Sequence, residues 1–435
     1  MLRLSRLILL AVWLAAFWNA AAAQAADPGI MVLQVKGTIN PVPVDYLQRS
    51  LDQAERDQAV AVIIQLDTPG GLDTAMRDIV QTISNSRVPV VVYVSPAGAR
   101  AASAGVFITM AAHVAAMAPG TAIGAAHPVS IGTSGETQVS DEMQQKILND
   151  AVAYIRSLAE AHGRNADWAE DAVKKSVSIT EQEALHLNVI DLVAPDINAL
   201  VQQLDGRPVT MLDGQVITLN TSGATLDYVK MNGIESILYA IADPNIAYLL
   251  LSLASLGILV EVFNPGLIFP GVIGAISGLL AFYALGMLPV NLAGVLLIVL
   301  AFGLFIAEAF TASFGLLTAG GATSLIIGSL ILFKGRSPLF QVSPWLIAFV
   351  TIIIVLIFVF VISRVVQAHR RRPSTGREEL AGKTATVRVA LAPVGTVLFK
   401  GELWTAVSEA GRIEPGEEVI ITRVDGLKLR VTKKG

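Results

Sequence analysis

The sequence predicts a chain of three folded parts: an α/β domain, an all-α multi-span membrane domain and a small C-terminal β-barrel. Three observations predict this fold class. Short runs rich in valine and isoleucine alternate with amphipathic stretches in residues 26–206. Apolar segments of about 20 residues, the length needed to cross a bilayer, recur through residues 245–367. Apolar and polar positions alternate in residues 380–435.

The composition of the whole chain agrees with a protein that lies partly in lipid. Of 435 residues, 53% are hydrophobic and 15% are charged, and the mean hydropathy is +0.61, which is outside the range of ordinary soluble proteins. The net charge of -4 offers no basic field for a phosphate backbone, so nucleic acid is a poor partner. The chain has no cysteine, which excludes disulfides and thiolate chemistry. We see no clustered metal ligands and expect no cofactor.

The first residues predict export. Arg3 and Arg6 precede an apolar run over Leu7–Phe17, and the A-x-A sequence Ala23–Ala25 follows that run. These features are typical of a secretory signal peptide. We therefore expect residues 1–25 to be removed and the rest of the α/β domain to be exported, with an uncleaved anchor helix as the alternative.

Residues 26–206 have the pattern of an α/β domain with buried strands, because its strand-like runs are apolar almost throughout. The expected strands are Ile30–Val35, Val60–Leu66 and Val88–Val94. The expected helices are Val42–Arg56, Asp73–Ser86, one that begins near Ser103, and Asp141–His162. Turn signals at Asp205-Gly206 and Asp213-Gly214 predict that the domain ends there and that residues 207–244 are a linker.

Five apolar segments predict a membrane domain over residues 245–367, with one transmembrane helix in each. The segments are Ile246–Phe263, Leu267–Met287, Leu292–Phe310, Phe314–Phe333 and Trp345–Val366. Their glycine and alanine content suits close helix packing. Glu261 and Glu308 lie at or near segment ends, where we expect them to reach the interface or to pair between helices rather than to form an ion pathway.

An exported N-terminal domain followed by five crossings places the C-terminus in the cytoplasm. The basic cluster His369–Arg372 agrees with the positive-inside bias, whereas Lys334 and Arg336 fall on the outer side and are in mild conflict with it. The sequence thus predicts a multi-pass protein of the cell (inner) membrane, with an extracytoplasmic α/β domain and a cytoplasmic C-terminal barrel.

Residues 380–435 predict that barrel. Apolar and polar positions alternate in Thr384–Val389, Glu418–Val424 and Leu427–Val431, and glycines separate the runs. A stretch of about 55 residues is near the lower limit for an independent core. A compact five-stranded barrel of the OB type therefore fits best.

Two glycine-containing stretches follow predicted strands, at the edge where open α/β sheets place their sites. Asp67–Gly71 has adjacent glycines that let backbone N–H groups turn toward a ligand, although alone it is more simply a turn. Ala99–Gly105 places Ser103 at the start of an apolar helix. A serine there is usually a cap, but its small neighbours admit a substrate backbone and a helix N-terminus stabilises developing negative charge. Together the two stretches favour a nucleophilic serine.

A serine nucleophile needs a base, and the sequence offers few. His113 lies in an apolar run and is expected to be a core or edge histidine, whereas His127 is a better candidate. Lys146 is the only lysine between Lys36 and Lys174 and lies on the flank of an apolar helix stripe. Its stem could therefore be buried and its amine directed into a site. Burial would favour the neutral amine that a base requires, although a solvent-facing side chain is the usual interpretation of a helix lysine.

Four stretches together resemble the long-form NfeD proteins, membrane-bound serine proteases encoded beside stomatin. They are Asp67–Gly71, Ala101–Gly105, Ala122–His127 and Lys146–Ile155. The whole chain is similar to the family in its order of signal, Clp-type protease domain, spans and OB-like tail. The resemblance implies a Clp/crotonase-like fold for the α/β domain, a homo-oligomer, and a stomatin-like (SPFH-type) membrane protein as partner or substrate.

The resemblance also implies roles for individual residues. The catalytic serine maps onto Ser103 and the catalytic lysine onto Lys146, and the oxyanion hole maps onto the backbone N–H groups of Gly71 and Ala104. Clp-type peptidases more generally use a histidine near the position of His127, so a Ser103–His127 pair is the competing assignment. In the dyad, neutral Lys146 accepts the hydroxyl proton as Ser103 attacks the peptide carbonyl and then protonates the leaving amine, and water resolves the acyl-enzyme.

Two other functions stay open. An acyl-coenzyme A enzyme is one, because the crotonase fold shares these strand-to-glycine turns, but export separates it from cytosolic coenzyme A. The other is a non-catalytic scaffold that organises a membrane microdomain with a stomatin-like partner, against which the presence of both Ser103 and Lys146 argues. The expected activity is a serine endopeptidase that cleaves hydrophobic segments of membrane-associated proteins.

Overall fold

The computed structural model describes residues 29–129, 140–263, 266–288, 290–311, 313, 315–333, 341–370 and 380–434. The chain divides into two compact units, Met1–Leu356 and Ile357–Gly435. The expected signal peptide, Lys334, Arg336 and the arginines at 371 and 372 lie outside the described residues.

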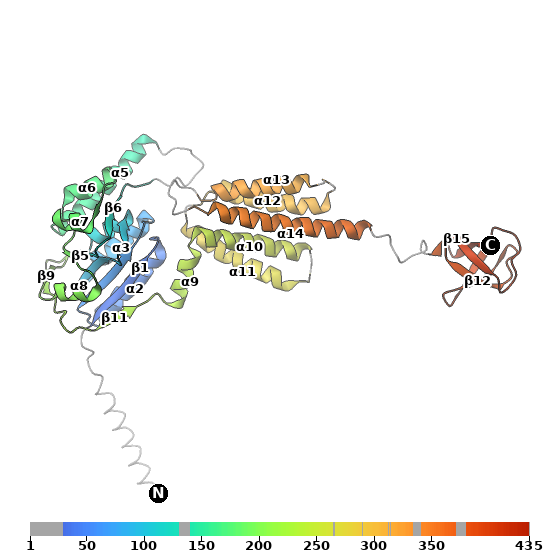
Figure 1. The fold of residues 1–435 in the computed structure, drawn as a ribbon, viewed down its shortest axis with the longest axis horizontal. Coiled ribbons are helices and arrows are strands. Elements are labelled where there is room, and N and C mark those ends of the chain that lie inside the picture. Colours follow the sequence, from blue (N-terminus) through green and yellow to red (C-terminus); the bar gives the residue numbers. More distant parts are fainter. Residues whose placement is uncertain are drawn as a thin grey trace, which may run out of the picture. The chain divides into compact units, whose positions relative to one another are not determined.

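A six-stranded sheet in the order β11-β1-β2-β3-β5-β8 forms the centre of the N-terminal part (Figure 1). Its strands are β1 (Ile30–Lys36), β2 (Ala61–Asp67), β3 (Val90–Val94), β5 (Val114–Met117), β8 (Leu192–Val193) and β11 (Leu226–Val229). All neighbours pair in parallel. Every residue of β3 is buried, as expected for a parallel strand covered on both faces. The three strands predicted from the sequence are confirmed.

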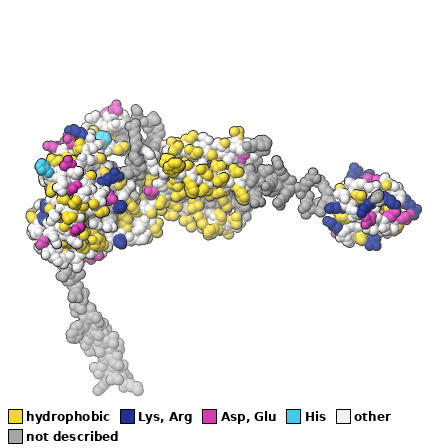
Figure 2. All heavy atoms as spheres, viewed as in Figure 1, with side chains coloured by type: hydrophobic (Ala, Val, Ile, Leu, Met, Phe, Trp, Pro, Cys, Tyr) yellow, Lys and Arg dark blue, Asp and Glu magenta, His cyan; other side chains and the backbone are white. Residues whose placement is uncertain are grey.

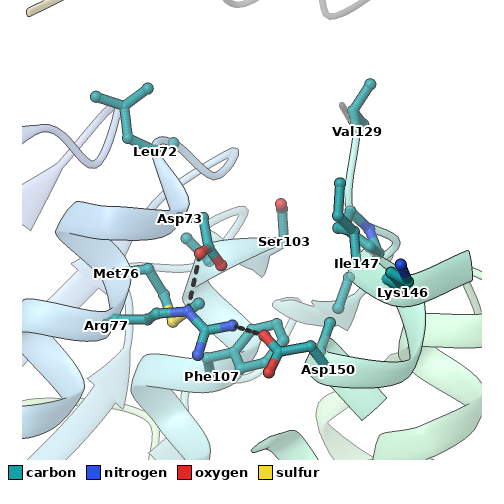
Figure 3. A pocket seen from close by; sticks show the side chains of 15 residues that line it. Leu72, Asp73, Met76, Arg77, Ser103, Phe107, Val129, Lys146, Ile147 and Asp150 are labelled. Atoms are coloured by element: carbon teal, nitrogen blue, oxygen red, sulfur yellow. Dashed lines mark hydrogen bonds and ion pairs between the residues drawn. The ribbon is translucent and has the colours of Figure 1, made fainter. Parts of the chain in front are cut away.

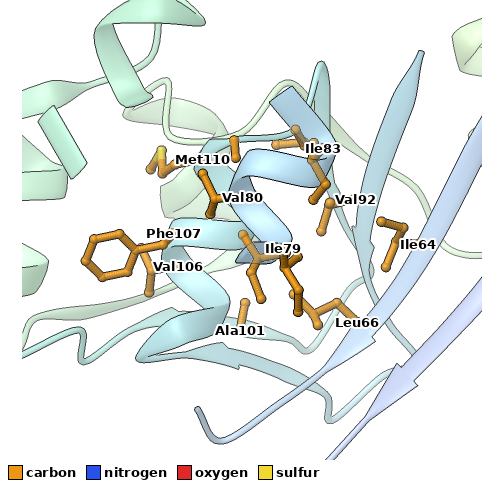
Figure 4. Packing of buried hydrophobic residues seen from close by; sticks show 14 of the residues in the cluster. Ile64, Leu66, Ile79, Val80, Ile83, Val92, Ala101, Val106, Phe107 and Met110 are labelled. Atoms are coloured by element: carbon orange, nitrogen blue, oxygen red, sulfur yellow. The ribbon is translucent and has the colours of Figure 1, made fainter. Parts of the chain in front are cut away.

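Helices on one face of this sheet bring the functional loops together. They are α2 (Pro41–Arg56), α3 (Asp73–Ser84), α4 (Ala104–Met110), α5 (Asp141–Ala161) and α6 (Ala166–Lys174). Ile79 and Val80 of α3 and Val106 of α4 belong to one buried cluster with Ile64 of β2 and Val92 of β3 (Figure 4). The opposite face is covered by α8 (Ile197–Leu204) and the hairpin of β9 (Pro208–Thr210) and β10 (Val216–Thr218).

A second, three-stranded sheet lies beside the main one and carries the candidate nucleophile. It consists of β4 (Arg100–Ala102), β6 (Ala122–Gly124) and β7 (Ser178–Thr180), in the order β4-β6-β7, and α7 (Glu181–His186) follows it. Thr68 joins this sheet to the end of β2, because its N–H donates to the Arg100 carbonyl at 2.8 Å and its carbonyl accepts from the Ala102 N–H at 3.0 Å. The two glycine-containing stretches are therefore neighbours in space.

The expectation of a linker over residues 207–244 is wrong. This segment contains β9, β10, β11 and a helix, α9 (Gly233–Ile241), and β11 is the edge strand beside β1. The turn signal at Asp213-Gly214 belongs to the β9–β10 hairpin rather than to a domain end. β11 was missed because a half-exposed edge strand of four residues lacks the continuous apolar run of a central strand.

A buried arginine ties the last turn of α4 to the segments around it. Arg164 donates to the carbonyls of Met110 and Ala112, at 2.8 and 2.9 Å, and to the Asp191 carboxylate at 2.7 Å. Its side chain is 1% exposed. These bonds satisfy carbonyls that a helix C-terminus leaves without intrahelical partners, so Arg164 fixes the far end of the helix that follows Ser103.

His113 is a structural residue, as expected. Its Nδ1 accepts a hydrogen bond from the Val90 N–H at 3.1 Å, and its ring lies edge-on to His162, 6.0 Å away between centroids. Burial, and then the nearby charge of Arg164, lowers the pKa of both histidines to about 4.

We expect these histidines to make the protein less stable in mild acid. The unfolded state takes up their protons near pH 6.5, whereas the folded state takes them up only near pH 4. Their contribution is therefore complete above about pH 6.5 and is lost as the pH falls toward 4. His113→Gln should show a shallower fall in melting temperature from pH 7 to pH 5 than the wild type, whereas His186→Gln, on the exposed surface of α7, should match the wild type. The same fall in melting temperature between pH 7 and pH 5 for all three proteins would contradict this account.

Five apolar helices lie in the segments predicted to span the membrane. They are α10 (Pro244–Phe263), α11 (Ile268–Met287), α12 (Leu292–Phe310), α13 (Leu316–Ile331) and α14 (Pro344–Arg370). Among the described residues, α10 and α11 are long and apolar enough to cross a membrane, and the apolar parts of the others are shorter. Hydrophobic side chains cover the visible surface of these helices (Figure 2). The number of crossings stays a prediction.

Contacts between α10 and α11 show why glycines occur in these helices, and contacts between α12 and α13 show the role of Glu308. A Cβ at Gly257 of α10 would lie 2.8 Å from the Cα of Gly274 in α11, so small residues allow these backbones to approach closely. Glu308 of α12 is buried and accepts hydrogen bonds from the N–H groups of Gly315 and Thr318, at 2.8 and 3.0 Å. This glutamate pairs with the next helix, as expected, by capping α13.

The C-terminal unit contains a closed five-stranded barrel in the order β12-β13-β14-β16-β15. Its strands are β12 (Thr384–Val389), β13 (Val394–Phe399), β14 (Glu402–Ser408), β15 (Glu418–Asp425) and β16 (Lys428–Lys433). The inward positions, such as Val387, Val397 and Leu429, are buried, and β14 and β16 pair in parallel. The predicted five-stranded barrel is confirmed.

Candidate active site

Ser103 occupies a strained turn between β4 and α4. Its φ and ψ are 53° and -113°, a backbone conformation that residues other than glycine rarely adopt. Its N–H donates to the Gly124 carbonyl at 3.2 Å, which holds the turn in place. Among the described residues, the Ser103 side chain makes no capping hydrogen bond with α4. The simplest alternative role, that of a helix cap, is therefore absent, and the hydroxyl is available for chemistry.

The loop after β2 passes so close to Ser103 that two of its positions require glycine. Gly70 has a φ of +120°, and a Cβ there would lie 2.7 Å from the Cβ of Ser103. A Cβ at Gly71 would lie 2.0 Å from the Ile39 carbonyl oxygen. The adjacent glycines therefore let this backbone fit between Ser103 and the segment after β1.

Two backbone N–H groups beside Ser103 are free to bind an oxyanion. Those of Gly71 and Ala104 donate to no other group within the described part of the chain. Ala104 is the first residue of α4, where an N–H has no intrahelical acceptor. Both positions match the oxyanion hole expected from the family resemblance, and the assignment stays a prediction.

A pocket of about 530 Å³ opens over Ser103, between α3, α4 and α5 (Figure 3). Its lining residues are Gly71, Leu72, Asp73, Met76, Arg77, Ser103, Ala104, Phe107, Ala126, Pro128, Val129, Lys146, Ile147, Asp150 and Ala151. The structure thus brings Ser103, Lys146 and both predicted oxyanion-hole residues to one pocket. Its wall is largely apolar, which suits an apolar substrate side chain.

Lys146 lies across the pocket from Ser103, but it is not buried. Its side chain is 67% exposed and its Nζ lies 3.4 Å from the Glu142 carboxylate, one turn earlier in α5. The expectation of a buried lysine stem is therefore wrong. Burial was predicted from an apolar stripe on this helix, but the stripe is buried only in part of the helix. Leu158 is buried, whereas Met143 is 48% exposed. The first turns of α5 extend beyond the core, so helical periodicity alone misjudged burial at this end.

His127 points away from the pocket. Its Nδ1 lies 2.9 Å from the Val173 carbonyl oxygen at the end of α6, and its side chain is exposed. Its neighbours Ala126 and Pro128 line the pocket, whereas His127 is not among the described residues that do so. Of the two candidate bases, Lys146 is therefore the one among the described lining residues of the pocket.

A charged cluster at the pocket wall was not predicted from the sequence. Arg77 of α3 pairs with Asp73 at 2.8 Å, pairs also with Asp150 of α5, and places its guanidinium 4.7 Å from the ring centroid of Tyr154. It therefore joins the helix after the glycine loop to the helix that carries Lys146. The Asp73–Arg77 spacing of four residues is visible in the sequence, but the contact with Asp150 depends on the tertiary fold.

Models of three protein-family domains match the chain in succession. The N-terminal domain of NfeD1b matches residues 29–227, the NfeD integral membrane domain matches 245–364, and the NfeD-like C-terminal, partner-binding domain matches 377–433. The chain is also 41% identical over 413 residues to the membrane-bound protease PH1510 of Pyrococcus horikoshii, with 93% of each chain covered. The chain belongs to the NfeD family.

Two other NfeD-related proteins are similar to this chain, one over nearly its whole length and one over half of it. The membrane protein NfeD1b of Bacillus subtilis is 29% identical over 427 residues, with 94% of each chain covered. A lysine-to-alanine mutant of the 1510-N membrane-bound stomatin-specific protease, solved in complex with a substrate peptide, is 40% identical. The match covers 50% of this chain and 98% of that one, with a TM-score of 0.46.

Membership of the NfeD family confirms the general predictions from the sequence. The chain is a membrane-bound protease with an α/β domain, apolar helices and a C-terminal barrel. The roles of individual residues, the substrate and the orientation in the membrane remain proposals.

Proposed function

We propose that this NfeD protein is a serine endopeptidase with Ser103 as the nucleophile and Lys146 as the general base. The observation that carries this proposal is the pocket in which Ser103, strained and without a capping bond, faces a helix bearing Lys146. His127, the competing base, is turned toward α6 instead. A scaffold without activity would need neither the strained serine nor the glycine loop packed against it.

Catalysis requires the Lys146 side chain to leave Glu142 and turn toward Ser103. The flexible four-carbon stem permits this movement, and a substrate that fills the apolar pocket would remove water around the amine and favour its neutral form. Neutral Lys146 then accepts the Ser103 proton as the Oγ atom attacks the peptide carbonyl. The N–H groups of Gly71 and Ala104 stabilise the oxyanion. The protonated lysine delivers its proton to the leaving amine, and water hydrolyses the acyl-enzyme.

The pocket supports an apolar substrate segment. Leu72, Met76, Phe107, Val129 and Ile147 contribute side chains to its lining, and burial of a leucine-sized side chain among them would contribute roughly 1.5–3 kcal/mol. The related 1510-N protein is described as stomatin-specific. We infer that this chain cleaves hydrophobic segments of membrane-associated proteins, with a stomatin-like protein as substrate or partner, and that its C-terminal barrel binds the partner.

The proposed arrangement in the cell follows from the sequence. A signal peptide, five crossings and the basic cluster that begins at His369 place the α/β domain outside the cytoplasm and the barrel inside it. Cleavage would then occur on the extracytoplasmic side of the cell (inner) membrane, in a homo-oligomer.

The test is cleavage of an apolar peptide by the full chain in detergent. We expect the wild type to cut a peptide that contains an apolar segment, to leave a composition-matched polar peptide intact, and to lose activity at least about 10³-fold on Ser103→Ala. Mass spectrometry of the products identifies the bond that is cut. Equal cleavage by wild type and Ser103→Ala would contradict the proposal.

A further inference from the structure

The short helix α9 connects the protease domain to the first membrane helix. It ends at Ile241, and α10 begins at Pro244. Asp243 lies between them and accepts hydrogen bonds from the N–H groups of Asn245 and Ile246, at 2.8 and 3.3 Å, which caps the start of α10. The chain therefore enters the membrane domain directly from α9, with no flexible spacer.

α9 is attached to the protease domain by an ion pair at its N-terminal end. Arg49 of α2 donates two hydrogen bonds to Glu235, at 2.7 and 2.8 Å. Glu235 also accepts from the Asn232 N–H at 2.7 Å, as part of a capping box. A bidentate pair with a half-buried arginine has a defined geometry, so this end of α9 has a fixed place on α2.

Tyr239, one turn later, reaches the segment that follows β1. Its hydroxyl donates to the Lys36 carbonyl at 2.7 Å and lies 3.2 Å from the Thr38 carbonyl oxygen. Burial raises the pKa of Tyr239 to about 12, so the hydroxyl keeps its proton and remains a donor. Gly37, with a φ of +99°, leaves the space that the hydroxyl occupies, because a Cβ there would lie 2.6 Å from it.

The segment Lys36–Ile39 also forms hydrogen bonds on both sides of Gly71, in the glycine-containing loop Asp67–Gly71 that follows β2. The Ile39 N–H donates to the Gly70 carbonyl and the Ile39 carbonyl accepts from the Leu72 N–H, each at 2.9 Å. These two bonds fix the peptide planes on both sides of Gly71 and so the direction of its free N–H. A continuous set of contacts thus runs from α9, through Tyr239 and Ile39, to Gly71.

We propose that Tyr239 is a positioning residue that couples α9, the helix that leads into the membrane domain, to the oxyanion hole. It touches neither substrate nor nucleophile, and it acts by holding the Lys36–Ile39 segment that orients the Gly71 N–H. This inference rests on the proposed function, because it assigns to Gly71 the role of oxyanion donor. Full activity then requires that α9, the segment that leads into the membrane domain, is docked on the protease domain.

The experiment compares Tyr239→Phe with Tyr228→Phe in the full chain in detergent. The Tyr228 side chain is 48% exposed on β11, and removal of its hydroxyl is the matched control. The probes are a fluorogenic apolar peptide and a peptide aldehyde of the same sequence, whose adduct with a serine bears an oxyanion. Complete loss of an oxyanion donor costs about 10²–10³-fold in kcat, and a displaced donor should cost roughly tenfold.

Tyr239→Phe should therefore lower kcat and weaken aldehyde inhibition by similar factors, with KM and melting temperature close to those of Tyr228→Phe. A kcat equal to that of the control, or a loss confined to KM, would overturn the coupling. Ser103→Ala separates the two proposals. If the wild type cleaves, Ser103→Ala is inactive and Tyr239→Phe equals the control, only the coupling fails; if Ser103→Ala cleaves as the wild type does, the proposed function fails and the coupling with it.

Discussion

Lys146→Ala is expected to lower kcat by about 10³-fold, which is within the range for loss of a general base. The fold should be unaffected, because the side chain is 67% exposed and its ion pair with Glu142 is of the surface type that contributes little to stability. Lys146→Arg should not restore activity, since a guanidinium does not give up its proton at any accessible pH. The measurement is steady-state peptide cleavage, with a melting curve for each variant.

Lys175 offers a matched control for this substitution. Its side chain is 66% exposed and it pairs with Asp171 at i,i-4 spacing, as Lys146 does with Glu142. Lys175→Ala should keep the activity of the wild type. A Lys146→Ala protein that cleaves as fast as Lys175→Ala would show that Lys146 is not the base.

Arg164→Met is expected to cause the largest loss of stability, about 3–5 kcal/mol, which is typical when one partner of a buried ion pair is removed. The substitution removes the 2.7 Å pair with Asp191, which keeps the Ala115 N–H at 2.7 Å and Arg207 at 3.5 Å, and it leaves the carbonyls of Met110 and Ala112 without these donors. Methionine fills part of the volume but donates no hydrogen bond. Chemical denaturation, followed by a probe in the α/β domain, measures the change.

Arg156→Met is the control for Arg164→Met. Arg156 also pairs with acidic residues, among them Glu170 at 2.7 Å, but its side chain is 34% exposed. We expect a loss of at most about 1 kcal/mol. Similar losses for the two variants would contradict the role of Arg164 as the anchor of α4.

The central strands and the two glycine-containing stretches could be predicted because their signals are local. β1, β2 and β3 are apolar along most of their length, as burial of both faces of the sheet requires. Gly70 and Gly71 mark a turn whose shape only glycine permits. Ser103 stands out by its position after a strand and before an apolar helix.

Other features depend on tertiary contacts that leave no local pattern. β11 joins the sheet by pairing with β1, almost 200 positions earlier in the chain. The Arg77–Asp150 contact and the Arg49–Glu235 pair link distant helices. The exposure of Lys146 follows from how far α5 extends past the core, whereas helical periodicity reports only which residues share a face.

The orientation of His127 was likewise beyond sequence reasoning. A histidine flanked by small residues near a candidate serine is a plausible base, and the family of Clp-type peptidases supports that role. In the structure its ring contacts the Val173 carbonyl of α6, and the neighbouring Ala126 and Pro128 face the pocket instead. The contact with α6 depends on how that helix packs, which no local motif encodes.

Labelling by a fluorophosphonate, which reacts with activated serines, tests the Ser103–Lys146 dyad most directly. The rate of labelling and the modified residue are measured by mass spectrometry for the wild type, Lys146→Ala and His127→Ala. The dyad predicts a label on Ser103, a rate at least about 10²-fold lower for Lys146→Ala, and an unchanged rate for His127→Ala. Fast labelling of Lys146→Ala together with slow labelling of His127→Ala would contradict the dyad and assign the base to His127.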